Sequence, residues 1–307
     1  MKSKICLNQR ADWDDYFYEL SQGIKNVIVE IIDKYTFCRL DLKKEDLKGK
    51  HGIDELLYKA IKKFIIENGV PASVYIETEE PLIRDKADFS IFIDPVDGSL
   101  NRDLGVGDPA IAVTFSFKEK PKFIDICYGY VYGLHSEDTY FTKGGKSYFK
   151  RKASAAIEIQ CDKFVKRLKD AILYYNDGYG GEFALNSLKR AGALPLFVKH
   201  HNAFDNTAME ICQICRGAAH LRVEARSYEK DGRQRGSEHA NMLAAFSIGK
   251  NAGLIVTDLN GAPLDEVYID LDKPQDFICG CGPELLKETI GILERNKHIL
   301  AEKLEED

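Results

Sequence analysis

The sequence lacks the features that mark membrane proteins, secreted proteins and nucleic-acid-binding proteins. No apolar run approaches the roughly 20 residues that a membrane helix requires, and no segment reads as a signal peptide. Its eight cysteines are too few and too scattered over 307 residues for a disulfide scaffold. The formal net charge of −6 provides no general attraction for nucleic acid or an anionic membrane. We therefore expect a cytoplasmic protein that binds neither.

The chain also has no internal repeat, no Walker phosphate-binding loop and no dinucleotide-binding fingerprint. Cys212 and Cys215 have redox-like spacing, but they lie inside a helical pattern, so we expect buried structural thiols. Hydrophobic residues at 44% and charged residues at 30% are typical of a globular protein. The length suits one large α/β unit or two packed lobes.

The first half of the chain predicts helices that cover one sheet. Apolar residues three or four apart predict helices over residues 11–35 and 53–68. Residues 72–78 and 89–95 are typical of short buried strands, and the segments that follow alternate like an antiparallel meander. We therefore expect residues 1–150 to form an N-terminal α+β lobe that carries the metal-binding motifs.

Strand-like and helical patterns alternate in the second half. The strand-like segments are residues 155–161, 170–176, 194–200 and 254–258. The helical segments are residues 182–191, 206–218, 238–252 and 282–307. This alternation predicts an α/β lobe over residues 151–307 that carries the substrate pocket. The fold class is thus mixed α/β and α+β, in two layered lobes with the site in the cleft where they meet.

The stretch FIDPVDGSLN, residues 92–101, places two acids on a tight turn after an apolar strand. Asp94 and Asp97 stand at the carboxyl end of that strand, where open α/β architectures place ligands. Gly98 leaves room in the turn. If a helix begins near Ser99, the backbone N–H groups of Gly98 and Ser99 form an anion site.

A second pair of acids ends the preceding strand. The stretch YIETEEP places Glu79 and Glu80 there, and neighbouring strands lie about 4.8 Å apart, so a glutamate can reach the same ion. Three converging carboxylates favour Mg²⁺, which takes oxygen ligands. The alternative to a metal site is that the DPVDG stretch forms an ordinary capped turn and that Glu79 and Glu80 are a solvated pair of charges.

Several motifs in order resemble one known family. FIDPVDGSLN resembles the DPxDGTxN signature of the inositol monophosphatase family, within the fructose-1,6-bisphosphatase superfamily of metal-dependent, lithium-sensitive sugar phosphatases. ETEE resembles the GEE element of the family, with Thr78 in place of glycine. Residues 138–146, 206–224 and 252–265 resemble further family segments, and the likeness covers nearly the whole chain.

The resemblance implies a layered α-β-α-β-α sandwich of the sugar phosphatase type and a homodimer. It also implies Mg²⁺-dependent hydrolysis of a small phosphorylated metabolite, an inositol or sugar phosphate, by metal-activated water. Two or three Mg²⁺ ions would be bound, with Mn²⁺ as a substitute and Li⁺ as an inhibitor. Glu79 and Asp94 would hold the water-bearing ion, Asp94 and Asp97 would bridge to a second ion, and the main-chain oxygen of Val96 would be a further ligand.

The remaining roles also come from the resemblance. Ser99 stands where the family has its catalytic threonine and would orient or deprotonate the water through the carboxylate of Asp54, which opens the second helix. Glu79, which holds the water-bearing ion, is the third catalytic candidate. The second-ion aspartate of the family is replaced by Asn241, which offers an oxygen without a charge. Glu238 either completes that site or caps the helix.

The substrate region departs further from the family pattern. Asn206 replaces a glycine before Thr207, and Arg222 stands at a tyrosine position. Glu224 matches the acid that contacts substrate hydroxyls, so Asn206, Thr207, Glu224 and Asn241, with Asp97, Gly98 and Ser99, are the substrate-binding candidates. Basic residues over 226–235 either hold a second phosphate or form a solvated loop.

Two alternatives to a simple sugar phosphatase stay open. One is a phosphatase of the same fold for a bisphosphate or nucleotide, such as fructose 1,6-bisphosphate or 3′-phosphoadenosine 5′-phosphate. The other is a non-catalytic phospho-ligand-binding protein with a weakened second metal site, which Asn241 favours.

Overall fold

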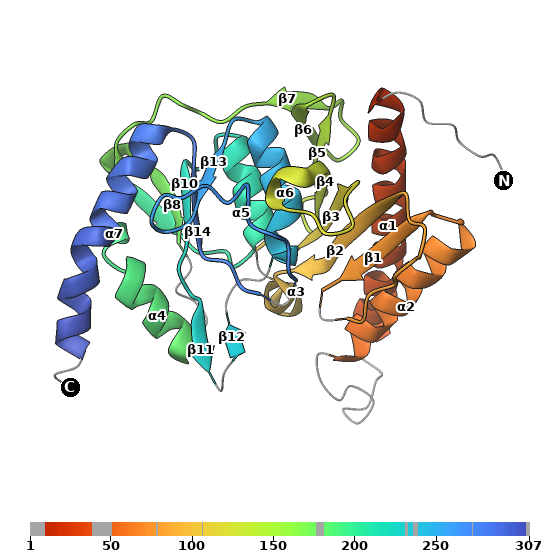
Figure 1. Cartoon of the computed structure of the whole chain (residues 1–307), viewed down its shortest axis with the longest axis horizontal. Helices are drawn as coiled ribbons and strands as arrows, with labels where there is room; N and C mark the ends of the chain where they lie inside the picture. The colour runs from red at the N-terminus through yellow and green to blue at the C-terminus, as the bar shows by residue number, and fades with distance from the viewer. Residues whose placement is uncertain are drawn as a thin grey trace.

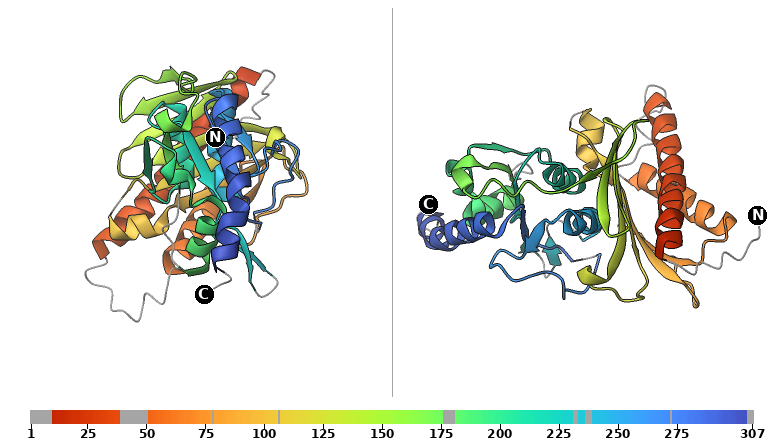
Figure 2. Two further views of the ribbon diagram at one scale, coloured as in Figure 1. Left: turned by 90° about the vertical axis from the view of Figure 1, so that its left-hand side faces the viewer. Right: turned by 90° about the horizontal axis from the view of Figure 1, so that it is seen from above.

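The computed structural model describes residues 10–38, 51–77, 79–105, 107–175, 181–230, 233–235, 239–271 and 273–304. Helices and sheets alternate in five layers, α-β-α-β-α, as Figure 1 and the view from above in Figure 2 show. The predicted layered fold class is therefore confirmed. None of the helices in the described ranges is both long enough and apolar enough to cross a membrane.

The first layer consists of α1 (Arg10–Cys38) and α2 (His51–Glu67), which pack against each other and match the two predicted helices. Their apolar residues recur every three or four positions, so each helix turns one stripe toward the first sheet. The stripe residues buried there are Phe17, Leu20, Ile24, Ile28, Leu57, Ile61 and Ile65.

The second layer is a seven-stranded sheet in the order β1 to β7. Its strands are β1 (Ala72–Ile76), β2 (Phe89–Asp97), β3 (Ala110–Ser116), β4 (Ile126–Gly133), β5 (Asp138–Lys143), β6 (Lys146–Arg151) and β7 (Ile157–Ile159). Strands β1 and β2 are parallel, and the rest pair antiparallel, which confirms the meander. The 3₁₀ turn η1 (Phe123–Asp125) precedes β4.

The middle layer contains α5 (Thr207–Cys215) and α6 (Ala240–Asn251), which pack against each other between the two sheets. Helix α6 contacts β2, β3 and β4 on one side and β13 on the other, so it is buried all round. Cys212 and Cys215 of α5 are fully buried, as predicted. The short helix α3 (Ser99–Leu104) follows β2 directly.

The fourth layer is a five-stranded sheet in the order β13-β14-β10-β8-β9. Its strands are β8 (Ile172–Tyr175), β9 (His200–Asn202), β10 (Leu221–Glu224), β13 (Ile255–Thr257) and β14 (Phe277–Gly280). Helices α4 (Gly181–Ala191) and α7 (Pro283–Leu304) form the fifth layer against it. The 3₁₀ turn η2 (Leu168–Asp170) precedes β8, and β11 (Tyr228–Lys230) and β12 (Arg233–Arg235) form a hairpin after β10.

The strand predicted over residues 194–200 is wrong. Leu194–Leu196 forms the 3₁₀ turn η3, and the strand β9 begins only at His200. Pro195 is the reason, because its fixed φ and missing N–H suit the first turn of a helix rather than a sheet ladder. Leu196 then points to solvent and is 83% exposed.

Candidate active site

The ends of β1 and β2 bring two acids together. Ile76 lies opposite Ile93 in the parallel register, and the next residue, Glu77, donates its N–H to the carbonyl of Ile93 at 3.0 Å. Glu77 therefore stands beside Asp94, the residue after Ile93, and the two carboxylates are within interacting distance. The contact joins the first two strands of the sheet at their carboxyl ends.

Asp94 has one carboxylate oxygen for which no hydrogen-bond partner is described. Its side chain is 1% exposed; Oδ1 accepts the N–H of Val96 at 2.9 Å, but Oδ2 is buried without a hydrogen-bond partner among the described residues. Burial, followed by the charges of Glu77 and Asp97, raises the pKa of Asp94 well above its usual range. Negative charge thus gathers at this turn, where Glu77 and Asp97 both act on Asp94.

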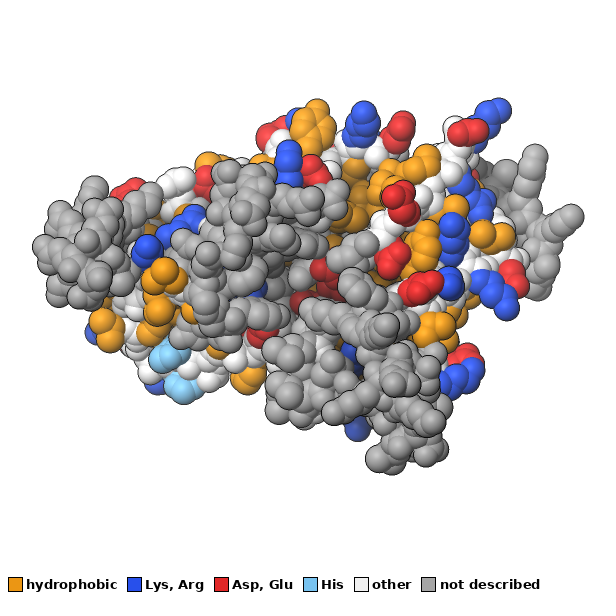
Figure 3. Space-filling model, turned by 90° about the horizontal axis from the view of Figure 1, so that it is seen from below, with side chains coloured by type: hydrophobic (Ala, Val, Ile, Leu, Met, Phe, Trp, Pro, Cys, Tyr) orange, Lys and Arg blue, Asp and Glu red, His pale blue; other side chains and the backbone are white. Residues whose placement is uncertain are grey.

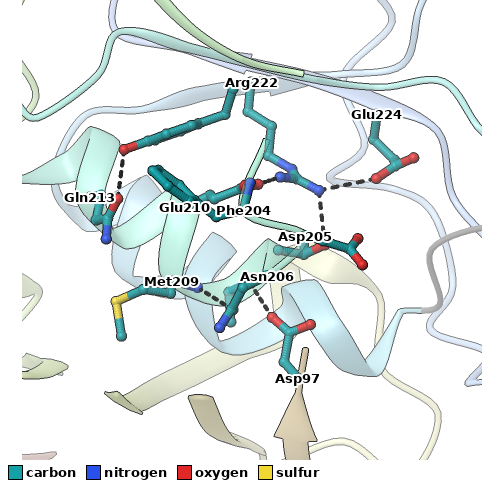
Figure 4. Close-up of polar contacts among 12 residues, drawn as sticks. Asp97, Phe204, Asp205, Asn206, Met209, Glu210, Gln213, Arg222 and Glu224 are labelled. Carbon is teal, nitrogen blue, oxygen red and sulfur yellow. Dashed lines mark hydrogen bonds and ion pairs between the residues drawn. The ribbon is translucent and has the colours of Figure 1, made fainter. Parts of the chain in front are cut away.

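Asp97 connects this turn to the second half of the chain. The register between β2 and β3 shifts between Asp94 and Asp97, so the strand bends where the acids lie. Asp97 Oδ2 accepts the backbone N–H of Ala208 at 2.6 Å, in the first turn of α5 (Figure 4). Burial raises the pKa of Asp97 to about 7, although the Ala208 N–H and the charge of Arg222 act in the opposite direction.

The turn after Asp97 requires glycine. Gly98 has φ 81°, in the left-handed region, and a Cβ there would lie 3.2 Å from the carbonyl of Asp205. Helix α3 begins at Ser99, which is the condition on which the expected anion site at Gly98 and Ser99 depended. Asn101, in the same helix, donates its side-chain N–H to the carbonyl of Phe204. The DGSxN stretch therefore packs directly on the loop that leads into α5.

Asn206 and Thr207 begin α5 at this junction. Asn206 is the N-cap residue: its Oδ1 accepts the N–H of Met209 at 3.0 Å, and its Nδ2 donates to the carbonyl of Asp108. Thr207 Oγ1 accepts a hydrogen bond from Arg222 at 3.0 Å. The structure thus brings these two predicted substrate residues beside Asp97.

Glu224, at the end of β10, lies in a network of buried charges. Arg222 is fully buried and pairs with Glu210 of α5 and with Glu224 (Figure 4). Arg226 pairs with Glu224 at 2.7 Å and with Asp205 at 3.1 Å. Burial alone would raise the pKa of Glu224, but the two guanidinium groups hold it below its usual range.

Four predicted site residues are not joined to this cluster by any described contact. Glu79 is half-buried, and its N–H donates to the carbonyl of Ile76 in a turn after β1. Asp54 lies in α2, but its side chain is outside the described part, as is the whole of Glu238. Asn241 is in the first turn of α6, and its Oδ1 is buried without a described hydrogen-bond partner.

Sequence reasoning missed Glu77 and Glu210. The signal for Glu77 is the strand register, because residue 77 faces residue 94 only when Ile76 pairs with Ile93. The signal for Glu210 is a buried arginine on a neighbouring strand that requires a counter-charge. Glu210 also accepts the N–H of Phe204 at 2.8 Å, so it holds the loop before α5.

The residues present fit a hard divalent cation. Mg²⁺ is bound through one or two protein carboxylates together with water and substrate phosphates. Glu77 and Asp94 provide such a pair, and Asp94 Oδ2 has a coordination position left. In the described ranges no three acidic, histidine or cysteine side chains are arranged to enclose a metal by themselves. Acidic side chains lie across the middle of the face seen from below (Figure 3).

The comparisons with known proteins agree with this geometry. No protein-family model matches the chain. A curated relative from Archaeoglobus fulgidus, named fructose-1,6-bisphosphatase/inositol-1-monophosphatase, is 26% identical over 208 residues, which cover 67% of this chain and 70% of the relative. The fructose-1,6-bisphosphatase of Pyrococcus furiosus is 24% identical over 242 residues, covering 79% and 82%. The crystal structure of inositol monophosphatase II from Staphylococcus aureus has a TM-score of 0.70 at 16% identity, covering 94% of this chain and 97% of that one.

The acids Glu77, Asp94 and Asp97, where β1 and β2 end, are called the acid turn below. The five alternating layers define the fold as an α-β-α-β-α sandwich of the sugar phosphatase type. The structural likeness to the staphylococcal protein establishes this fold over nearly the whole chain. The curated relatives add the sequence likeness. The chain is thus similar to proteins named fructose-1,6-bisphosphatase and inositol monophosphatase, and these comparisons support the resemblance to the inositol monophosphatase family.

Proposed function

We propose that this protein is a phosphoric monoester hydrolase that uses Mg²⁺ to convert a small phosphate ester and water into an alcohol and inorganic phosphate. The substrate class is a polyol or sugar phosphate. The observation that carries the proposal is the buried Asp94 Oδ2, which has no hydrogen-bond partner among the described residues and lies on a carboxylate that the charge of Glu77 perturbs. The names of the curated relatives, all phosphatases, support it.

The acid turn holds the metal in this proposal. Glu77 and Asp94 would bind the first ion, with Glu79 and the carbonyl of Val96 as further candidate ligands. When bound, Mg²⁺ lowers the pKa of a water molecule and stabilises the charge on the leaving oxygen. Asp97 would serve a second ion, because it lies three residues beyond Asp94, across the bend in β2, and its charge perturbs Asp94.

The other candidate residues take the roles that their positions allow. Ser99 and Asp54 would orient the attacking water. Asn241 would contribute to the second ion its Oδ1, which has no hydrogen-bond partner within the described ranges. Glu238 is the further candidate ligand there. The amides of Gly98 and Ser99 and the start of α5 at Asn206 and Thr207 would receive the phosphate, which is positioning rather than covalent chemistry.

A bisphosphate substrate is the second candidate function. The A. fulgidus and P. furiosus relatives carry fructose-1,6-bisphosphatase in their names, and the basic residues over 226–235 are available for a second phosphate. A non-catalytic phospho-ligand-binding protein is the third, and it rests on the neutral Asn241 at the second-ion position.

The cellular setting is part of the proposal. The six cysteines whose side chains are described form no disulfide, and the Cys161 thiol lies within hydrogen-bonding reach of Cys215 and Cys281. Unpaired neighbouring thiols are the state that a reducing cytoplasm maintains. The homodimer rests on the family resemblance.

The test is phosphate release from a panel of sugar, inositol and nucleotide phosphates, with Mg²⁺ and after its removal by a chelator. We expect release that requires Mg²⁺, is restored by Mn²⁺ and is inhibited by Li⁺. Phosphate binding without turnover of any ester would favour the non-catalytic alternative. Release that persists after chelation would exclude the metal mechanism.

A further inference from the structure

Glu210 is a buried carboxylate in the mostly apolar helix α5. It is 1% exposed, and its neighbours Met209 and Ile211 belong to the hydrophobic core. Burying a charge costs free energy unless the charge is paired and hydrogen-bonded. Glu210 is both, because it forms an ion pair with Arg222 and accepts the N–H of Phe204 through Oε1 at 2.8 Å. The acid therefore connects α5 to the loop that precedes it.

The backbone of Phe204 is held through both of its polar groups. Its N–H donates to Glu210, and its carbonyl accepts the side-chain N–H of Asn101 from helix α3. Asn101 belongs to the DGSLN stretch, residues 97–101, which begins with Asp97 of the acid turn. Phe204 thus lies between the carboxylate of Glu210 and the stretch that carries Asp97.

Further contacts join the same loop to the DGSLN stretch. Asp97 Oδ2 accepts the N–H of Ala208 at 2.6 Å. Gly98 packs on the carbonyl of Asp205, which is 3.2 Å from the point where a Cβ of Gly98 would be. A shift of residues 204–208 would therefore be passed directly to the carboxylate of Asp97.

We propose that Glu210 is a positioning residue for the acid turn, because it fixes Phe204 and, through residues 204–208, the carboxylate of Asp97. In Figure 4, Glu210 and Arg222 lie above the start of α5 and Asp97 lies below it. The alternative is that Glu210 only neutralises Arg222. The consequence for metal binding rests on the proposed function, in which Asp97 would serve the second ion.

The test uses two double variants that lack both charges of the buried ion pair. Arg222→Met with Glu210→Gln keeps an oxygen that accepts the N–H of Phe204, whereas Arg222→Met with Glu210→Met keeps none. Hydrogen exchange of the metal-free proteins measures the local opening of residues 97–101. We expect this segment to exchange roughly tenfold faster in the Glu210→Met form, because only that form releases Phe204.

The same two variants test the consequence for metal binding. In calorimetric titrations with Mg²⁺ alone, we expect the second ion to bind about tenfold more weakly to the Glu210→Met form than to the Glu210→Gln form. The first ion, at Glu77 and Asp94, should bind both forms equally. If Glu210 only neutralised Arg222, the two forms would have equal affinities, because they lack the same charges.

Glu288 of helix α7 provides the matched control. It also accepts a backbone N–H, that of Leu168 at 2.9 Å, and pairs with an arginine, Arg167, at 3.5 Å. We expect Glu288→Met to speed exchange around Leu168 and to leave residues 97–101 and the Mg²⁺ titration at their wild-type values.

If the Glu210→Met form does not fold, the Glu210→Gln form still decides the question. Because it keeps the acceptor for Phe204, exchange of residues 97–101 should rise no more than exchange in the rest of the chain. A selective rise in that segment overturns the inference.

The outcomes separate this inference from the proposed function. If no ester is hydrolysed or no metal binds, the proposed function fails, and hydrogen exchange still tests the positioning role. Equal exchange of residues 97–101 in the two double variants overturns that role. Equal affinities of the two variants for a second Mg²⁺, in a protein whose wild type binds two ions, overturn it as well.

Discussion

The acid turn and the buried charge network handle charge in opposite ways. In the acid turn, Glu77, Asp94 and Asp97 gather negative charge, and Asp94 keeps an oxygen without a described partner. In the network around Arg222 and Glu224, each arginine contacts two acids. The difference separates the place where the proposed cation would bind from the place where acids are already paired with arginines.

The contrast separates two kinds of buried polar group. A group that is unsatisfied inside the protein costs free energy, and a fold that retains one generally uses it for binding or catalysis. In the network around Arg222 and Glu224, by contrast, each arginine is paired with acids inside the protein. In the proposed function, the chemistry would therefore lie in the first half of the chain and the choice of substrate in the second.

The largest effect should come from Asp94→Asn. Without this carboxylate the metal is held poorly, and we expect activity to fall on the order of ten thousandfold. The metal-free protein should become more stable, because the substitution removes a buried charge that repels Glu77 and Asp97. Phosphate release and urea denaturation in the presence of a chelator measure the two effects.

Asp85→Asn, at an exposed position in the same region of the chain, is the control for Asp94→Asn. It should change neither quantity. A loss of stability in metal-free Asp94→Asn would show that Asp94 supports the fold, and the contrast between the two regions would then fail.

Arg222→Met should have the next largest effect, which we expect in the free energy of unfolding. The substitution leaves Glu210 and Glu224 buried without one of their counter-charges, which costs about 3–5 kcal/mol. Arg222→Met combined with Glu210→Gln should recover part of that loss, because the two residues are coupled. Urea denaturation of the wild type, of Arg222→Met, of Glu210→Gln and of the double variant gives the coupling energy.

Arg151→Met provides the comparison for Arg222→Met. Arg151 also pairs with an aspartate, Asp138, but its side chain is 62% exposed. We expect a change within about 1 kcal/mol. Additive losses in the Arg222 and Glu210 variants would mean that the network is not a unit.

The layered fold and the acid turn could be predicted from sequence because their signals are local. Apolar spacing indicated α1 and α2, and the DPVDG stretch indicated a turn with acids after a buried strand. The strand prediction over residues 194–200 was wrong for a reason that is also local, because Pro195 overrides the apolar pattern around it.

The partners of each acid could not be predicted, because they depend on register and packing between distant segments. Glu77 rather than Glu79 contacts Asp94 because Ile76 pairs with Ile93. The pairing of Arg222 with Glu210 joins a strand to a helix twelve residues earlier in the chain. The isolated sequence shows such residues only as departures from a pattern.

A smaller effect should distinguish Glu77 from Glu79 at the acid turn. Because Glu77 contacts Asp94, we expect Glu77→Gln to raise the Mg²⁺ concentration for half-maximal activity by about tenfold. Glu79→Gln is the matched variant two residues away, and a larger shift there would make Glu79 the ligand. Mg²⁺ titrations of activity, with calorimetry of metal binding, measure both.

The prediction with the smallest expected effect concerns how His220, in the second half of the chain, makes stability depend on pH. His220 accepts the N–H of Ile172 at 3.0 Å through Nδ1, and burial lowers its pKa below the ordinary 6.5. The unfolded chain then binds more protons, so this residue makes stability fall as the pH drops below about 6.5, by at most about 1.4 kcal/mol per pH unit. His220→Asn keeps an acceptor that does not titrate and should flatten the curve, while His201→Asn, at an exposed histidine, should leave it unchanged. If the stability of His220→Asn still falls as steeply at acidic pH as that of the wild type, the group that titrates is another residue.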